Sequence, residues 1–466
     1  MPDIAPLILR ASSLQLPVVE VSRRQVNQLS LAQLVWTFYR PSGANLCRWG
    51  RQLKLITVDH QHFARLTDAL AIALAISLPW STSATGILAA LWLLALIPTL
   101  ELRSLRRVFI IPAGGLPALL VVLGGVGMLW ADVPWGERLG AMSSFVKLLF
   151  IPLFLQRFYR SDAGRQVLIG FLGSCVALLV VSWSRWLVLS RPGTEFSIGI
   201  PVKDYIAQGA MFTICSLVIV RLAYDKWNDG HRRVALALIA LAVLFFLNVL
   251  YIATSRTYLV VFPLLLVVFG YQQFGWKGAI GLVVGCVVFA MAVWPSAPFL
   301  RLRVSSFVDE IRLYQRTSKT ITSAGQRLGY WSKSVSFIRE APLLGHGTGS
   351  IGDQFRRSAI GQFGIASEVS DNPHNQTLAI GIQIGLVGIA VLLAMWAAHL
   401  ALFQGNSFAA WVGLVVVMQN IISSLFNSHL FDFTHGWAYV IGVGIAGGTA
   451  LKESGAWSQR KHNSNS

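Results

Sequence analysis

One histidine lies where the chain could carry out acid–base chemistry. His374 follows Asn372 and Pro373 and comes just before a long apolar run. Asparagine is a favoured N-cap and proline a favoured first helical residue, so the pattern predicts His374 in the first turn of a helix. A helix N-terminus disfavours the imidazolium, and a neutral imidazole can act as a general base. The unpaired N–H groups at such an end also favour a nearby phosphate.

Three glycines follow His374 at spacings that indicate a packed helix face. Gly381, Gly385 and Gly388 come 7, 11 and 14 residues after the histidine, which at about 100° per residue places all of them on its side of the helix. Glycines on one face allow a second helix to approach closely. A capping or core histidine on a tightly packed helix would show the same spacing, so the residues alone leave both interpretations open.

The composition indicates which kind of element must position these residues. Of 466 residues, 55% are hydrophobic and 12% are charged, and the mean hydropathy is +0.60. Soluble proteins carry about a quarter charged residues, so we expect lipid to be the solvent. For the same reason the net charge of +18 does not indicate a nucleic-acid partner. Four scattered cysteines without CxxC spacing predict neither a disulfide framework nor a metal site.

Apolar runs predict an all-α, polytopic integral membrane protein, because a spanning helix needs roughly 20 mostly apolar residues. About twelve transmembrane helices are expected, at 66–80, 84–100, 108–130, 138–156, 166–189, 205–224, 234–252, 257–272, 277–296, 376–402, 408–426 and 436–451. They divide the chain into a cytoplasmic N-terminal tail (1–65), helices one to nine (66–296), a large periplasmic loop with short helices (297–373), helices ten to twelve (374–451) and a cytoplasmic tail (452–466).

The distribution of Lys and Arg predicts the orientation. The two tails and the connections 101–107, 157–165 and 225–233 are basic, whereas 81–83 and 131–135 carry neither residue. The positive-inside rule then places both termini in the cytoplasm and His374 on the outward side.

Two outward connections break this alternation, one with Arg191 and Lys203 and the other with Arg256 in a short turn. A cation at such a position needs a partner carboxylate or an anionic ligand. Arg256 is therefore a candidate anion-binding residue.

Several motifs resemble one membrane-enzyme superfamily. His374 and Asn375, nine residues, and then GLVG at 385–388 resemble the H-[NSQ]-x9-G-x-x-G signature of O-antigen ligases. This superfamily also includes O-antigen polymerases and bacterial protein O-oligosaccharyltransferases. The segment 327–349, which runs from an arginine to a glycine-rich stretch, resembles its loop pattern. The turn 255–257 resembles its arginine at the outer end of a span.

The resemblance implies transfer of a finished O-polysaccharide from undecaprenyl diphosphate to a sugar hydroxyl of lipid A–core, at the periplasmic face of the cell inner membrane. No metal or other cofactor is implied, because arginines offer fork-shaped donors that match phosphate oxygens. Arg256 and Arg327 are the first candidates to hold the diphosphate, and Arg191 is the third. His374 would take the proton of the attacking hydroxyl, with inversion at the anomeric carbon. Membrane lipids are the other expected partner.

Four further residues are candidates for substrate contact, each with a structural alternative. Asn375 could orient the base or a phosphate, or simply cap the helix. Tyr330 and Trp331 could stack on sugar or polyprenyl, or lie at the membrane interface as aromatic residues often do. His346, in the glycine-rich stretch, could touch a ligand, although a tight turn that shapes the cavity is the simpler interpretation.

Three other polar residues receive no chemical role. Lys147 falls within the fourth predicted span, where we expect it to be paired or to snorkel. His429 and His435 fall in the last outward turn, and nothing in the sequence separates them from solvated residues at a cavity rim.

Alternatives remain within and beyond the superfamily. Polymerases share the donor but tend to present two large outward loops, and protein O-oligosaccharyltransferases often extend further at the C-terminus. A lipid-linked glycan flippase or a secondary transporter would place polar groups near the midplane, commonly in repeated halves. Here the polar residues concentrate at one membrane face, which favours an enzyme.

Overall fold

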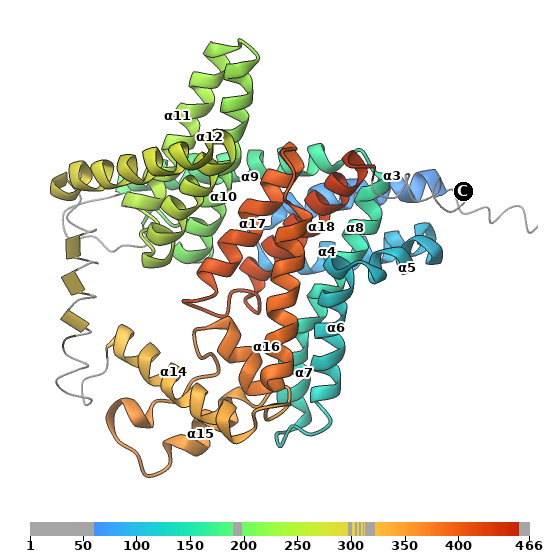
Figure 1. Ribbon diagram of the computed structural model, residues 1–466, viewed down its shortest axis with the longest axis vertical. Coiled ribbons are helices and arrows are strands. Elements are labelled where there is room, and N and C mark those ends of the chain that lie inside the picture. The colour runs from blue at the N-terminus through green and yellow to red at the C-terminus, as the bar shows by residue number, and fades with distance from the viewer. Residues whose placement is uncertain are drawn as a thin grey trace, which may run out of the picture. The chain divides into compact units, whose positions relative to one another are not determined.

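The computed structural model describes residues 60–189, 198–296, 301–302, 305–306, 309–310, 312 and 322–455 (Figure 1). Arg191, the N-terminal tail to residue 59 and most of 297–321 lie outside the described residues. Within the described ranges every regular element is helical, which confirms the predicted all-α fold. The α-helices are α3 (His60–Ser77), α4 (Thr82–Leu96), α5 (Leu102–Ile110), α6 (Pro112–Gly127), α7 (Trp135–Val146), α8 (Phe150–Arg160), α9 (Gly164–Leu189), α10 (Tyr205–Asn228), α11 (Arg232–Tyr251), α12 (Arg256–Val293), α14 (Ser323–Glu340), α15 (Ile351–Ala359), α16 (Gln376–Leu402), α17 (Phe408–Ser423) and α18 (Phe433–Glu453).

The helices have the lengths and composition of a polytopic membrane protein. Among the described residues, seven helical segments are long and apolar enough to cross a membrane, and the pair α5–α6, bent by 88°, would make an eighth. Each of the twelve predicted spans overlaps a described helix. The predicted spans 257–272 and 277–296 both fall on α12, which has non-helical backbone angles at Gly275 (φ 67°, ψ −157°). The described residues thus contain seven or eight candidate spans rather than the twelve predicted. Two predicted spans merge in α12, and α3, α17 and α18 are too short or not apolar enough to be counted as spans.

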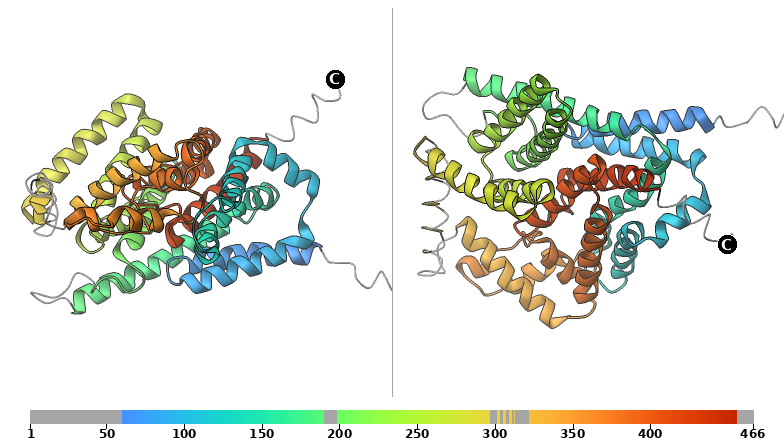
Figure 2. Two further views of the ribbon diagram at one scale, coloured as in Figure 1. Left: turned by 90° about the horizontal axis from the view of Figure 1, so that it is seen from below. Right: turned by 45° about the horizontal axis from the view of Figure 1, so that its top comes forward.

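Close helix packing is built on small residues. Cβ atoms placed on Gly444 and Gly448 of α18 would lie 2.4 and 2.8 Å from the Cβ atoms of Phe154 and Phe158 on α8. Within lipid the hydrophobic effect does not drive helices together, so close van der Waals packing is a main source of helix association. α10 and α11 also lie side by side, as the two views of Figure 2 show.

α16 breaks in its middle, and the glycine-rich stretch docks into the break. Gly385 has φ 67° and ψ −160°, so the prediction of a regular glycine face through this position is wrong. The peptide N–H of Leu386 donates to the carbonyl of Pro342 at 2.8 Å, and that of His346 donates to the carbonyl of Ile382 at 2.8 Å. The stretch 342–347 thus satisfies backbone groups that the break exposes, as a membrane interior requires.

The helices α14 and α15 pack against α16 (Figure 1). Tyr330 and Phe337 of α14 and Phe355 of α15 form a small separate core with Ala379 and Ile382 of α16. This core joins the region before α16 to the membrane helices and positions the site described next.

Candidate active site

His374 lies just outside the helix that was expected to contain it. α16 begins at Gln376, and Asn375 is its N-cap, with the side-chain oxygen accepting from the N–H of Leu378 at 3.1 Å. The prediction that Asn372 caps the helix and that His374 lies in its first turn is therefore wrong. Asn372 Oδ1 instead accepts from the N–H of His374 at 2.8 Å, which closes a local turn.

The His374 backbone is held in a strained conformation. Its φ is 54°, and Lys203 is the other non-glycine residue with positive φ in the described chain. This left-handed region costs a residue with a side chain roughly 1–2 kcal/mol. Such strain persists where surrounding contacts over-determine it, and it concentrates at functional sites.

A short hydrogen-bond chain determines which ring nitrogen of His374 carries hydrogen. A backbone N–H can only donate, so the Asn372 atom that faces the N–H of His374 is the oxygen, and its Nδ2 donates to Asn427 Oδ1 at 2.8 Å. Asn427 Oδ1 also lies 3.0 Å from His374 Nδ1. An oxygen acceptor requires a hydrogen on Nδ1, which leaves Nε2 as the basic nitrogen of the neutral ring.

The surroundings of His374 favour its neutral form. Burial lowers the pKa of His374 most, the charge of Arg327 lowers it further, and the hydrogen bond with Asn427 opposes both. The sequence predicted that a helix terminus would favour the neutral ring, whereas in the structure burial and the charge of Arg327 lower the pKa of His374. The ring lies nearly parallel to that of Tyr330, with 6.0 Å between the centroids.

The two predicted diphosphate arginines belong to the same charged neighbourhood. Arg256 Nη2 donates to Glu310 Oε1 at 3.0 Å and to Ser306 Oγ at 3.1 Å. Burial acts to raise the pKa of Glu310, but hydrogen bonds from Arg256 and from the N–H of Ala324 outweigh it, so the net pKa is lowered. Arg327 has a pKa lowered by burial, with the Arg256 charge acting in the same direction. The carboxylate partner that the sequence left open for Arg256 is thus Glu310.

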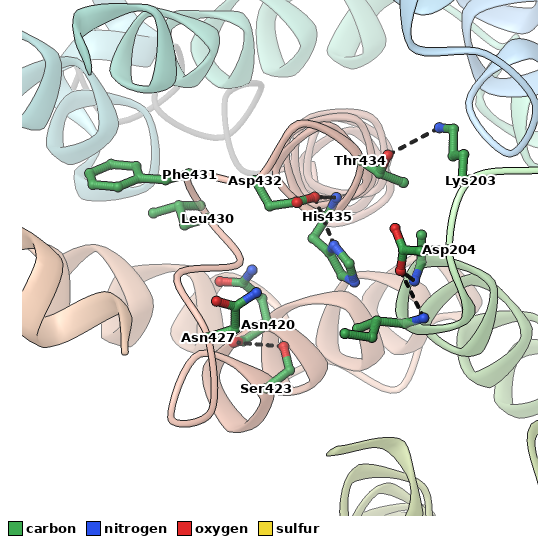
Figure 3. A network of polar contacts seen from close by, with 12 residues as sticks. Lys203, Asp204, Asn420, Ser423, Asn427, Leu430, Phe431, Asp432, Thr434 and His435 are labelled. Atoms are coloured by element: carbon green, nitrogen blue, oxygen red, sulfur yellow. Dashed lines mark hydrogen bonds and ion pairs between the residues drawn. The ribbon is translucent and has the colours of Figure 1, made fainter. Parts of the chain in front are cut away.

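The turn between α17 and α18, together with the first turn of α18, holds polar residues to which the sequence assigned no role. His429 is 1% exposed and His435 is 8% exposed, so both are buried, a distinction that the sequence left open. Their rings stack with 4.1 Å between centroids. Asp432 caps α18 and accepts from His435 Nδ1 at 2.8 Å (Figure 3). Burial and then His435 lower the pKa of His429 well below its ordinary value.

Two lysines anchor this turn, which also carries Asn427. Lys147 Nζ donates to the carbonyls of Phe431 and Asp432 at 2.9 and 2.7 Å, so it is paired, as predicted. Lys203 donates to Thr434 Oγ1 at 3.1 Å (Figure 3). The spacing Asp-x-x-His at a helix start and a lysine inside a span were the sequence signals that could have pointed here.

Three other residues that were predicted to contact substrate have their described contacts within the protein itself. His346 Nε2 lies 2.8 Å from the carbonyl of Phe337, within the stretch that docks into the α16 break. Tyr330 is 7% exposed and packs on Phe355 and His374. The indole nitrogen of Trp331 is buried with no hydrogen-bond partner among the described residues.

Comparison with known proteins gives two matches. Residues 240–393 match the family model described as O-antigen ligase, and this segment contains Arg256, Arg327 and His374. Over 132 residues the chain is 26% identical to an uncharacterized protein of Haemophilus influenzae, which covers 28% of this chain and 33% of that protein. The chain thus matches about a third of that relative's length. The segment 240–393 is thus similar to the O-antigen ligase superfamily over about a third of the chain.

Proposed function

We propose that this protein is an O-antigen ligase, an inverting glycosyltransferase of the inner membrane. It would move O-polysaccharide from undecaprenyl diphosphate to lipid A–core on the periplasmic side, with both termini in the cytoplasm. The observation that carries the proposal is the position of His374, whose Nδ1 lies 3.0 Å from Asn427 Oδ1 and whose pKa is lowered by burial and by the charge of Arg327.

The residues suit each part of this reaction. Nε2 of His374 takes the proton of the acceptor hydroxyl as its oxygen bonds to the anomeric carbon. The bond from that carbon to the diphosphate breaks on the opposite face, and the diphosphate leaves with the electron pair. Arg256 and Arg327 neutralise the charge that grows there.

The pairing of Arg256 with Glu310 is compatible with this role. A diphosphate offers more charge and more acceptor oxygens than one carboxylate, and arginine binds phosphate through paired hydrogen bonds. We therefore expect Arg256 to exchange Glu310 for the donor diphosphate. The dominant outward loop 297–373 favours a ligase over a polymerase.

The test is a reconstituted transfer. The purified full chain is incubated with undecaprenyl-diphosphate-linked glycan and lipid A–core, without nucleotide and with a chelator. We expect glycosylated core on a gel, greatly reduced by Arg327→Gln. Arg339→Gln is the matched control, because Arg339 is exposed on the same helix α14.

Other products would overturn the proposal. Elongation of the glycan on its polyprenyl carrier would identify a polymerase, and transfer to an added protein would identify an oligosaccharyltransferase. A strict requirement for a metal ion would contradict the role given to the arginines.

A further inference from the structure

We propose that a polar cavity beside the His374 segment is a saccharide subsite that holds hydroxyl-rich sugar of the acceptor, an inference that rests on the proposed function. The cavity has a volume of about 500 Å³ and lies between α7, α15, the first turns of α16 and the turn 424–432. Ligand pockets commonly fall between about 300 and 1,000 Å³. Asn372 and Pro373 line it, so the cavity begins one residue from His374.

The lining of the cavity is mainly acidic, in contrast to the region around Arg256 and Arg327. Its ionisable lining residues are Glu137, Asp371, Asp432 and Arg356, which makes three carboxylates against one guanidinium. Neither Arg256 nor Arg327 lines it. A diphosphate would be repelled by this lining, whereas sugar hydroxyls can donate hydrogen bonds to carboxylate oxygens. The 372–374 segment therefore borders an anion-binding region and a region suited to uncharged, hydroxyl-rich rings.

The floor of the cavity is already built. Gln383 is 2% exposed, and its Oε1 accepts from the N–H of Gly349 at 2.9 Å. Ser428 is 5% exposed and donates to Asn372 Oδ1 at 2.8 Å. Side chains fixed in this way bind with little ordering cost.

One wall consists of small residues that leave room for a ring. Gly140, Ala141 and Ser144 of α7 line the cavity, and Phe431 contributes an apolar surface. A Cβ on Gly140 would meet nothing within 4 Å. A larger side chain at Gly140 can thus enter the cavity without a clash at its Cβ.

This space allows a matched pair of variants. Gly136 also lies on α7 with nothing within 4 Å of a Cβ, but it does not line the cavity. In the reconstituted transfer we expect Gly140→Leu to raise the KM for lipid A–core by about tenfold or more, with the KM for the polyprenyl donor nearly unchanged. Gly136→Leu should leave both values near those of the wild type.

A second pair tests the charge. Asp371→Asn should raise the acceptor KM by a smaller factor, because an amide accepts fewer hydrogen bonds than a carboxylate. Glu340→Gln is its control, since Glu340 is exposed on α14 and does not line the cavity. An acceptor KM that is the same for Gly140→Leu and Gly136→Leu overturns the subsite, and so does a change confined to the donor KM.

A binding measurement separates this inference from the proposed function. Saturation-transfer NMR with delipidated, dephosphorylated core oligosaccharide should show binding to the wild type and to Gly136→Leu, and a much weaker signal with Gly140→Leu. That pattern without any transfer would retain the subsite and reject the ligase. Transfer by the wild type without this difference in binding would reject the subsite and retain the ligase.

Discussion

At the scale of single residues, the two ring nitrogens of His374 have different surroundings. Nδ1 faces the side-chain oxygen of Asn427, whose identity follows from the hydrogen bonds of Asn372. Asn427 in turn belongs to the turn that Lys147 anchors through the carbonyls of Phe431 and Asp432. In the proposed reaction, Asn427 would therefore be a positioning residue, acting through the orientation and tautomer of His374.

Asn427 can be tested through the pH dependence of activity. Asn427→Asp keeps an acceptor for Nδ1–H but adds a negative charge, which stabilises the imidazolium and raises the pKa of His374. Because the neutral ring is the active form, the acid limb of kcat/KM should move to higher pH by roughly one pH unit.

A second variant at the same position gives the comparison. Asn427→Leu removes the acceptor, so kcat should fall by at least about tenfold across the whole pH range. An acid limb that stays in place or moves to lower pH in Asn427→Asp would exclude this role for Asn427.

At the scale of elements, the break in α16 determines where the site forms. Gly385 interrupts the helix, and the stretch 342–347 binds the exposed backbone groups. The carbonyl oxygen of Leu343 would lie 2.3 Å from a Cβ on Gly385. The first glycine of the signature, Gly385, therefore serves backbone geometry, and its neighbours join the region before α16 to the membrane helices.

Substitution of Gly385 should be costly to stability. Gly385→Ala combines a positive φ with a backbone clash, so we expect a loss of roughly 2 kcal/mol or more and a clearly lower Tm in detergent. Gly285→Ala on α12 is the control, since a Cβ there meets nothing within 4 Å. Equal Tm values for the two variants would show that the break tolerates a side chain.

Elements were easier to predict than the contacts between them. Apolar runs and turn residues are local signals, so all twelve predicted spans overlap helices. The break at Gly385 depends on a segment about 40 residues upstream, which periodicity cannot reveal. The burial of His429 and His435 likewise depends on neighbouring helices, so the sequence of this short turn could not distinguish them from solvated residues.

At the scale of the whole molecule, the proposed reaction requires the His374 face to be periplasmic. Gln362, near α15, and Arg233, at the start of α11, are both exposed and lie in connections of opposite predicted orientation. In intact cells a membrane-impermeant maleimide should label Gln362→Cys but not Arg233→Cys, with wild type as the blank. Permeabilised cells should show labelling of both. Labelling of Arg233→Cys in intact cells would reverse the orientation.

The central claim is that His374 acts as the base in glycan transfer. The most direct measurement is the single-turnover rate of transfer to lipid A–core by His374→Gln, with donor binding measured on the same preparation. Glutamine retains polar contacts but cannot accept the proton, so we predict near-normal donor binding and a rate lower by about 10²-fold or more. A rate close to that of the wild type, with the donor equally well bound, would contradict the account.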